Sequence, residues 1–289
     1  MLFEDLQTRL AAFNRHRLEP RLADDRACDW LERQFDQQRL EVDWVDRERA
    51  QIERQVSKVP TDPERFTAWF EGLAERGPGQ KDALFPWLES QASEAEMLWF
   101  LRQEVAGEAG FEDLVALTQL QLPVRAKLEL ARNYWDEMGR GQAGGMHGPM
   151  LQHLAHELEL PDVPVVVESV ALGNLMLALA CNRHFAFQSI GALGVIELTA
   201  PGRAEKVNAG LKRLGVRADI RRYFAIHSTL DVRHSEAWNR EVLAPLVAER
   251  PDTAAAIAEG ALLRLSAGQR CFRRYRNKLW GEERAAAAQ

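Results

Sequence analysis

The chain has 289 residues, 46% of them hydrophobic, which suits one large domain or two small ones. Its net charge of −6 provides no global positive field, so we expect no nucleic-acid partner. Its three cysteines are too few and too scattered for a disulfide framework or a thiolate metal site.

The N-terminal part of the chain predicts a helical extension over residues 1–60. Residues 25–58 form a long, charged, heptad-like stretch with few helix breakers, which is typical of a solvated helix that packs along one side. The first five residues contain two acids and no basic region before an apolar core. We therefore expect no secretion signal and a cytoplasmic protein.

Helical periodicity continues from residue 61 to about residue 283, and strand-like alternation is almost absent. Thr61 or Asp62 is a plausible N-cap for the first helix of this region, and Ser93 begins another with a capping-type sequence. Further helices are expected at residues 111–122, 123–139, 163–183, 184–198, 203–214, 218–249 (with a break at Pro245) and 252–280. The pattern predicts an all-α, multi-helix domain over residues 61–283, followed by a frayed tail at 284–289.

Two segments of this region have unusual compositions. Residues 163–181 are the most apolar stretch, but they contain Glu168 and Asn174, which favours a buried core helix over a membrane span. We therefore expect no membrane partner. Residues 139–148 contain five glycines and cannot remain helical throughout.

The most informative motif is the run from His227 through Asp231 to His234. At about 100° per residue these three side chains fall on one face of a helix, which they share with Phe224 and Trp238. A carboxylate buried between two imidazoles is costly unless a positive charge satisfies it. Imidazole nitrogen and carboxylate oxygen are the usual ligands of iron, manganese and zinc. An exposed polar edge or a hydrogen-bonded core triad is the alternative.

Glu197 is the clearest further candidate because Phe187, Ile190 and Gly194 share its helix face. It precedes Pro201, where we expect a helix to end and its dipole to disfavour an anion, which a bound cation would offset. A capping acid at a helix end is the alternative. Gly194, like the glycine three residues before it, would let another helix approach closely.

Three further candidates complete the set. Glu137 lies on an apolar face directly before the glycine-rich segment, and His147 lies at the exit of that segment. Glu104 follows an apolar face of its own helix, with Glu108 as a rival one turn later. Another pair of histidines, His153 and His156, could also bind a metal.

The candidate ligands are therefore Glu104, Glu137, His147, Glu197, His227, Asp231 and His234. Four carboxylates match the charge of two divalent cations, so the site could be buried without a large net charge. Oxygen and imidazole ligands without a thiolate favour iron or manganese over a structural zinc.

At these residues the chain resembles the heme-oxygenase-like diiron oxidases and oxygenases over about residues 90–280. The fingerprint of that superfamily is an early Glu, a second Glu with a His several residues later, a lone Glu on a middle helix, and a late His-x3-Asp-x2-His. The glycine-rich spacer before His147 departs from it. A ferritin-like bundle would instead show Glu-x-x-His pairs on two helices, and this chain has none.

This resemblance implies a seven-helix core that binds two iron ions and uses O₂ as co-substrate through a peroxo-diferric species. It also implies a small substrate that bears an amine or a carboxylate, either amino-acid-derived or a fatty acid. The expected outcomes are N-oxygenation, oxidative C–C cleavage or desaturation.

Two other classes of function remain open. Relatives of the same scaffold act without metal, as cofactor-independent oxidases or thiaminase-like enzymes, and Cys181 is the position that could supply a nucleophile. Alternatively, the chain is a non-catalytic interaction protein whose residues 25–58 form a homodimer or dock another subunit.

Overall fold

The computed structural model describes residues 2–22, 27–107 and 110–281. Within these ranges the chain is all-α apart from one isolated bridge, which confirms the predicted fold class. The helices in chain order are α1 (Phe3–Leu18), α2 (Ala27–Val56), α3 (Pro63–Glu71), α4 (Leu73–Arg76), α5 (Leu84–Ser90), α6 (Glu94–Gly107), α7 (Phe111–Thr118), α8 (Val124–Glu137), α9 (His147–Glu157), α10 (Val167–Cys181), α11 (Ala186–Arg213), α12 (Arg222–Trp238), α13 (Ala244–Glu249) and α14 (Thr253–Trp280). The start of the predicted 25–58 helix, the rival ligand Glu108 and the predicted tail at 284–289 lie outside the described residues.

Two helix starts follow the local capping signals. The Asp62 carboxylate accepts a hydrogen bond from the Arg65 backbone N–H at 2.9 Å, so Asp62 is the cap of α3. At the start of α6, the backbone N–H of Ser93 donates to the Glu96 carboxylate at 2.8 Å, and the Glu96 N–H donates back to the Ser93 hydroxyl at 3.4 Å. This reciprocal pair is a capping box.

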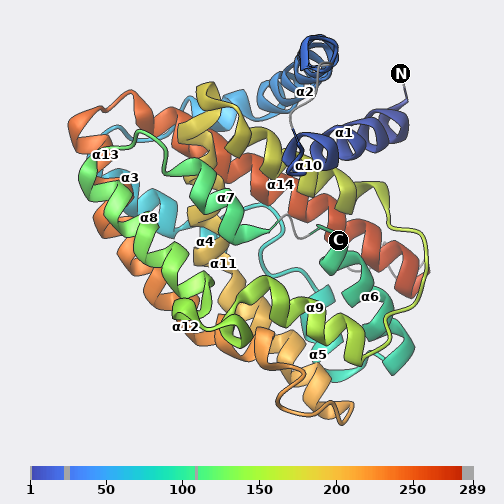
Figure 1. Ribbon diagram of the computed structural model, residues 1–289. Coiled ribbons are helices and arrows are strands. Elements are labelled where there is room, and N and C mark those ends of the chain that lie inside the picture. Colours follow the sequence, from blue (N-terminus) through green and yellow to red (C-terminus); the bar gives the residue numbers. More distant parts are fainter. Residues whose placement is uncertain (1, 23–26, 108–109, 282–289) are drawn as a thin grey trace.

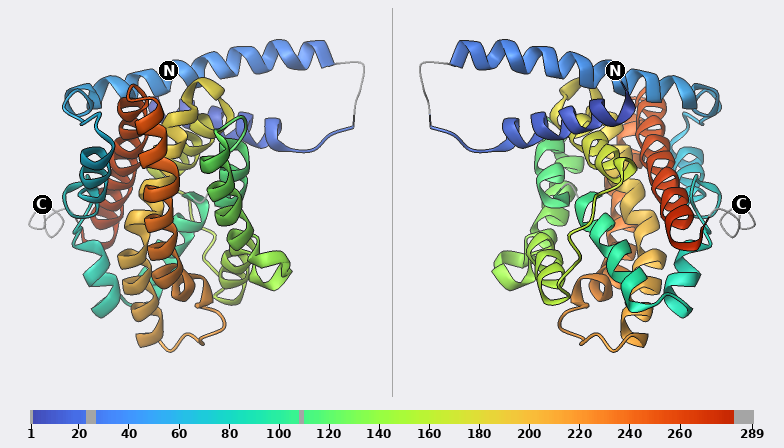
Figure 2. Two further views of the ribbon diagram at one scale, coloured as in Figure 1. Left: turned by 90° about the vertical axis from the view of Figure 1, so that its left-hand side faces the viewer. Right: turned by 90° about the vertical axis from the view of Figure 1, so that its right-hand side faces the viewer.

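Helices α1 and α2 lie side by side along one end of the bundle and project beyond it (Figures 1 and 2). Buried polar contacts hold them to α10. Asn14 of α1 donates to the side-chain oxygen of Asn174 at 2.9 Å, and Asn182 donates to Glu41 of α2 at 2.8 Å. Glu41 also pairs with Arg17 at 2.8 Å. The polar Asn174 within the apolar α10 is therefore explained by its hydrogen bonds to α1.

The centre of the bundle is α11, which packs against α12, α14 and α5. A Cβ on Gly191 would collide with the Ile257 carbonyl of α14, and a Cβ on Gly260 of α14 would collide with the Gln188 carbonyl. Absence of both Cβ atoms lets the two backbones approach closely, as predicted for Gly191. Within the described ranges, no helix combines the length and the hydrophobicity that a membrane crossing requires.

Two predicted breaks are wrong. α11 runs unbroken from Ala186 to Arg213 with Pro201 inside it, so Glu197 lies in the middle of a helix and not near its end. The predicted dipole argument for Glu197 therefore does not apply. Burial of α11 against three other helices outweighs the local cost of a proline. Pro245 likewise does not end a helix: it lies in the first turn of α13, which follows a π-helical segment, η4 (Asn239–Leu243).

Candidate metal centre

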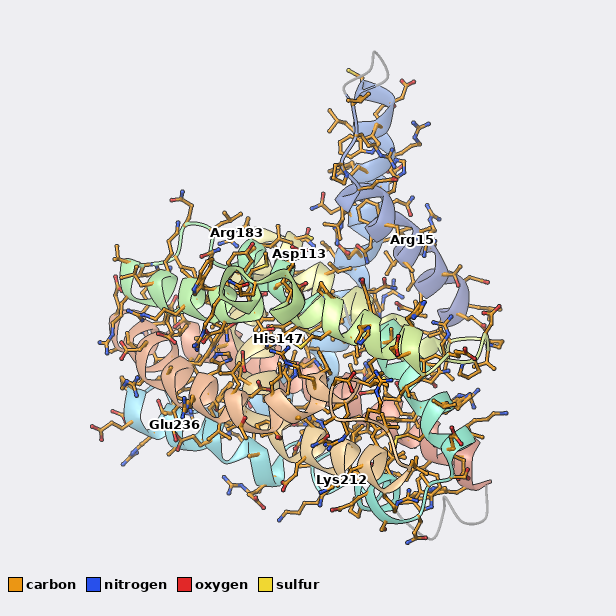
Figure 3. All side chains as sticks on the ribbon, turned by 60° about the horizontal axis from the view of Figure 1, so that its bottom comes forward. Arg15, Asp113, His147, Arg183, Lys212 and Glu236 are labelled. Atoms are coloured by element: carbon orange, nitrogen blue, oxygen red, sulfur yellow. The ribbon has the colours of Figure 1, made fainter. Side chains whose placement is uncertain are left out.

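The glycine-rich segment brings Glu137 and His147 together. α8 ends at Glu137, α9 begins at His147, and Met138 pairs with Met146 in an antiparallel bridge that closes the loop between them. Gly139 has a positive φ of 60°, and a Cβ on it would collide with the backbone on the other side of the loop. His147 Nδ1 lies 2.5 Å from Glu137 Oε2 as a result. His147 lies inside the bundle, whereas Arg15 lies on the projecting helices (Figure 3).

Glu197 projects from α11 and is only 2% exposed. Asn133, one turn before the end of α8, donates to Glu197 Oε1 at 2.5 Å. The other oxygen, Oε2, lies 3.4 Å from His234 Nδ1. Asn133 thus orients the Glu197 carboxylate and leaves its Oε2 directed at the His234 imidazole.

Hydrogen bonds to the outer nitrogen of two imidazoles orient both rings. His227 Nδ1 donates to the Tyr223 carbonyl at 2.7 Å, which leaves Nε2 available. His234 Nε2 lies 3.1 Å from the Asp136 carboxylate, which leaves Nδ1 on the side of Glu197. Asp136 also accepts from Arg140 at 2.6 Å. Such outer partners fix which nitrogen of an imidazole faces a metal.

Five of the predicted residues form two groups of ligand atoms that share one member. Glu137, His147 and His227 make the first group, and Glu137, Glu197 and His234 make the second. Within each group the ligand atoms all lie within 4.8 Å of one another. A carboxylate common to two groups is suited to bridge two neighbouring metal ions.

Beside these groups lies a cavity of about 140 Å³, which all the predicted residues except His234 line. Asp231 is 2% exposed, and its Oδ1 has no hydrogen-bond partner among the described residues. Glu104 is hydrogen-bonded to Tyr275, whose hydroxyl is 2.8 Å from that of Ser169. An unpartnered buried carboxylate oxygen facing a cavity is costly unless a cation compensates it. The donor set therefore fits a pair of divalent transition-metal ions.

Burial and neighbouring charges shift the pKa values of four groups in the site, and not all in the same direction. Burial lowers the pKa of His147 and of His227 to about 4, so both imidazoles are neutral at pH 7 and able to bind metal. Burial by itself lowers the pKa of His234, but the hydrogen bond and charge of Glu197, together with Asp136, raise it to about 9. Burial, followed by the charges of the neighbouring carboxylates, raises the pKa of Asp231 well above its ordinary value.

The rival candidates lie elsewhere. His153 and His156 are exposed on α9. Cys181 does not line the cavity, and burial raises the pKa of its thiol, which is opposite to the activation that a nucleophilic cysteine needs.

Sequence reasoning missed four residues around the site. Asn133 and Asp136 orient ligands, and Arg203 and Arg264 line the cavity. Asn133 lies one helical turn before Glu137, a spacing that places both on one face, so a search for polar residues one turn from each candidate ligand would have found it. The two arginines have no such signal: Arg203 shares α11 with Glu197 but is not one turn from it, and Arg264 lies on α14, which carries no candidate ligand.

Comparisons with known proteins bear on the fold and on the family of this chain. A comparison with curated proteins found no match. Two crystal structures of a CADD-like protein of unknown function from Nostoc punctiforme PCC 73102 superpose with TM-scores of 0.58 and 0.56 at 20% identity. The matches cover 75% of this chain and 98% and 96% of theirs, which confirms the predicted bundle as a fold. The model of a family described as iron-containing redox enzymes matches residues 98–269, a range that contains all seven candidate ligands. This chain belongs to the family of iron-containing redox enzymes.

Proposed function

We propose that the chain is a non-heme diiron oxidase or oxygenase that uses O₂ to oxidise a small substrate bearing an amine or a carboxylate. The oxidation would be an N-oxygenation, an oxidative C–C cleavage or a desaturation. The observation that carries the proposal is the pair of ligand groups that share Glu137. Membership of an iron-containing redox enzyme family supports iron as the metal.

In this proposal Glu137 would help to hold both ions, because it belongs to both groups. His147 and His227 would hold the first ion, and Glu197 and His234 the second. The two remaining candidates line the adjacent cavity and would complete the coordination: Asp231 and Glu104. The Glu104 carboxylate also accepts a hydrogen bond from Tyr275.

Two iron ions, when bound, supply the electrons and the open positions through which O₂ is activated. The chain itself contributes orientation and exclusion of water. Tyr223, Asp136 and Asn133 hold a ligand each through the hydrogen bonds described above. Apolar side chains on the cavity wall, such as Phe224 and Ile196, would keep bulk water from the reacting atoms.

Anaerobic loading with Fe(II), followed by measurement of bound iron and of O₂ uptake, tests the proposal. We expect two iron ions per chain and O₂ consumption after mixing. His147→Ala should lower the iron content, whereas His153→Ala, an exposed position on the same helix, should not. Less than one iron per chain in the unmodified protein would overturn the proposal.

The two alternatives make different predictions. A thiaminase-like enzyme would lose activity in Cys181→Ser, whereas a diiron enzyme would retain it. A non-catalytic interaction protein would bind no iron at all. Homodimer formation through α2 stays a prediction, which measurement of the molecular mass in solution would test.

A further inference from the structure

Two arginines share the cavity with the candidate ligands. Arg203 comes from α11 and Arg264 from α14, and both line the cavity beside Glu104 and Asp231. Neither guanidinium is needed as a metal ligand, because arginine remains protonated and has no free lone pair to offer. The charges of both arginines act on Glu104, whose pKa they lower against the effect of burial.

The Arg203 guanidinium packs against two aromatic rings. Its guanidinium carbon lies 5.9 Å from the ring centroid of Phe85 and 5.7 Å from that of Phe272. The two rings hold the planar group in place without using its N–H donors. Burial and the nearby charge of Arg264 lower the pKa of Arg203 to about 10, so it stays charged at neutral pH.

The negative charges of Glu104 and Asp231 raise the pKa of Arg203 and so act on it across the cavity. Metal binding changes this balance. The cavity is lined by five carboxylates, two of them belonging to Glu104 and Glu112, and by the two arginines. With two divalent cations bound, the positive charges of the metals and the arginines would exceed the five negative charges by one, in a poorly solvated space. Protonation of any carboxyl would make this positive surplus larger. An uncompensated positive charge in a buried site is costly, so the substrate is expected to carry a negative charge.

We propose that Arg203 and Arg264 together bind the carboxylate group of the substrate. This inference rests on the proposed diiron function and narrows its substrate class to small monocarboxylates. A carboxylate fits the planar fork of a guanidinium through paired hydrogen bonds, and its single charge matches the surplus. The remainder of the molecule would lie along the apolar wall formed by Phe111, Leu151 and Val207. A cavity of about 140 Å³ limits that remainder to a short chain or a single ring.

The test measures binding and not turnover. Anaerobic protein loaded with Fe(II) is titrated calorimetrically with hexanoate and with hexanamide, which has the same shape and no charge. We expect hexanoate to bind at least tenfold more tightly than hexanamide. Arg203→Gln and Arg264→Gln should each weaken hexanoate binding about tenfold to a hundredfold, because hydrogen bonds to charged groups are the stronger ones. Neither substitution should change the iron content.

Arg273→Gln is the matched control, because this arginine is exposed on α14. Arg203→Lys keeps the charge but lacks the fork, and should restore only part of the affinity. The inference would be overturned if the unmodified protein bound hexanoate and hexanamide equally well, or if neither Arg203→Gln nor Arg264→Gln weakened hexanoate binding. Either result would leave the diiron proposal intact. Failure of the unmodified chain to bind iron would instead overturn the proposed function, and this inference with it.

Discussion

Replacing Asp136 with Asn should weaken metal binding, although Asp136 is not one of the proposed ligands. Its carboxylate lies 3.1 Å from His234 Nε2 and thereby directs the other nitrogen of the ring toward Glu197. Loss of such an outer partner typically costs 10- to 100-fold in metal affinity, or about 1.4 to 2.8 kcal/mol. The Asp136 side chain is 21% exposed, and an Asn oxygen can still accept the hydrogen bond. We therefore expect about the lower value, a tenfold loss.

Two measurements check this expectation. Anaerobic competition between the protein and a chelator of known affinity gives the Fe(II) dissociation constant. NMR titration of the metal-free protein gives the pKa of His234, which should fall from about 9 because the charge and hydrogen bond of Asp136 help to raise it. Asp113→Asn, an exposed position on α7, is the control. A lowered His234 pKa also weakens the competition between proton and metal, so the two affinities are compared after correction for the protonated fraction of His234. A corrected Fe(II) affinity within twofold of the unmodified protein would refute the argument that Asp136 acts by orienting the ring.

Three further outcomes are expected. The pKa of His234 is raised to about 9 in the metal-free chain, so its stabilisation of that chain is fully present below about pH 6.5 and is lost as the pH rises through 9. A metal must displace this proton, so calorimetry in buffers of different ionisation enthalpy should detect proton release at pH 7, and metal affinity should rise with pH up to about 9. Gly139→Ala should lower metal affinity, because its Cβ would force apart the loop that joins the two ligands, whereas Gly144→Ala, whose Cβ would meet nothing within 4 Å, should leave affinity within twofold. Gly191→Ala should destabilise the fold by about 2 kcal/mol or more, because the added Cβ would collide with α14. Gly202→Ala, with open space around it, should be neutral or stabilising in thermal unfolding. Equal melting temperatures for these two variants would contradict the close-packing argument.

Local patterns were sufficient for the helix content and for several helix starts. Asp62 and Ser93 cap the helices that follow them, because a capping side chain bonds to backbone groups only a few residues away. The same patterns failed at Pro201, where burial against three neighbouring helices outweighs the local preference for a break. Periodicity on an apolar face also marked the ligand candidates, since a polar residue interrupting a buried stripe is detectable from spacing alone.

Which of those candidates meet, and what surrounds them, depended on the tertiary structure. Glu137 and His147 approach each other because a closed loop reverses the chain, and the packing of α8, α11 and α12 places Glu197 beside His234. Asp136, which orients His234, comes from α8, whereas the two arginines at the cavity wall, Arg203 and Arg264, come from α11 and α14. No spacing rule links such residues, because their distance is set by how the helices pack and not by the geometry of any one helix.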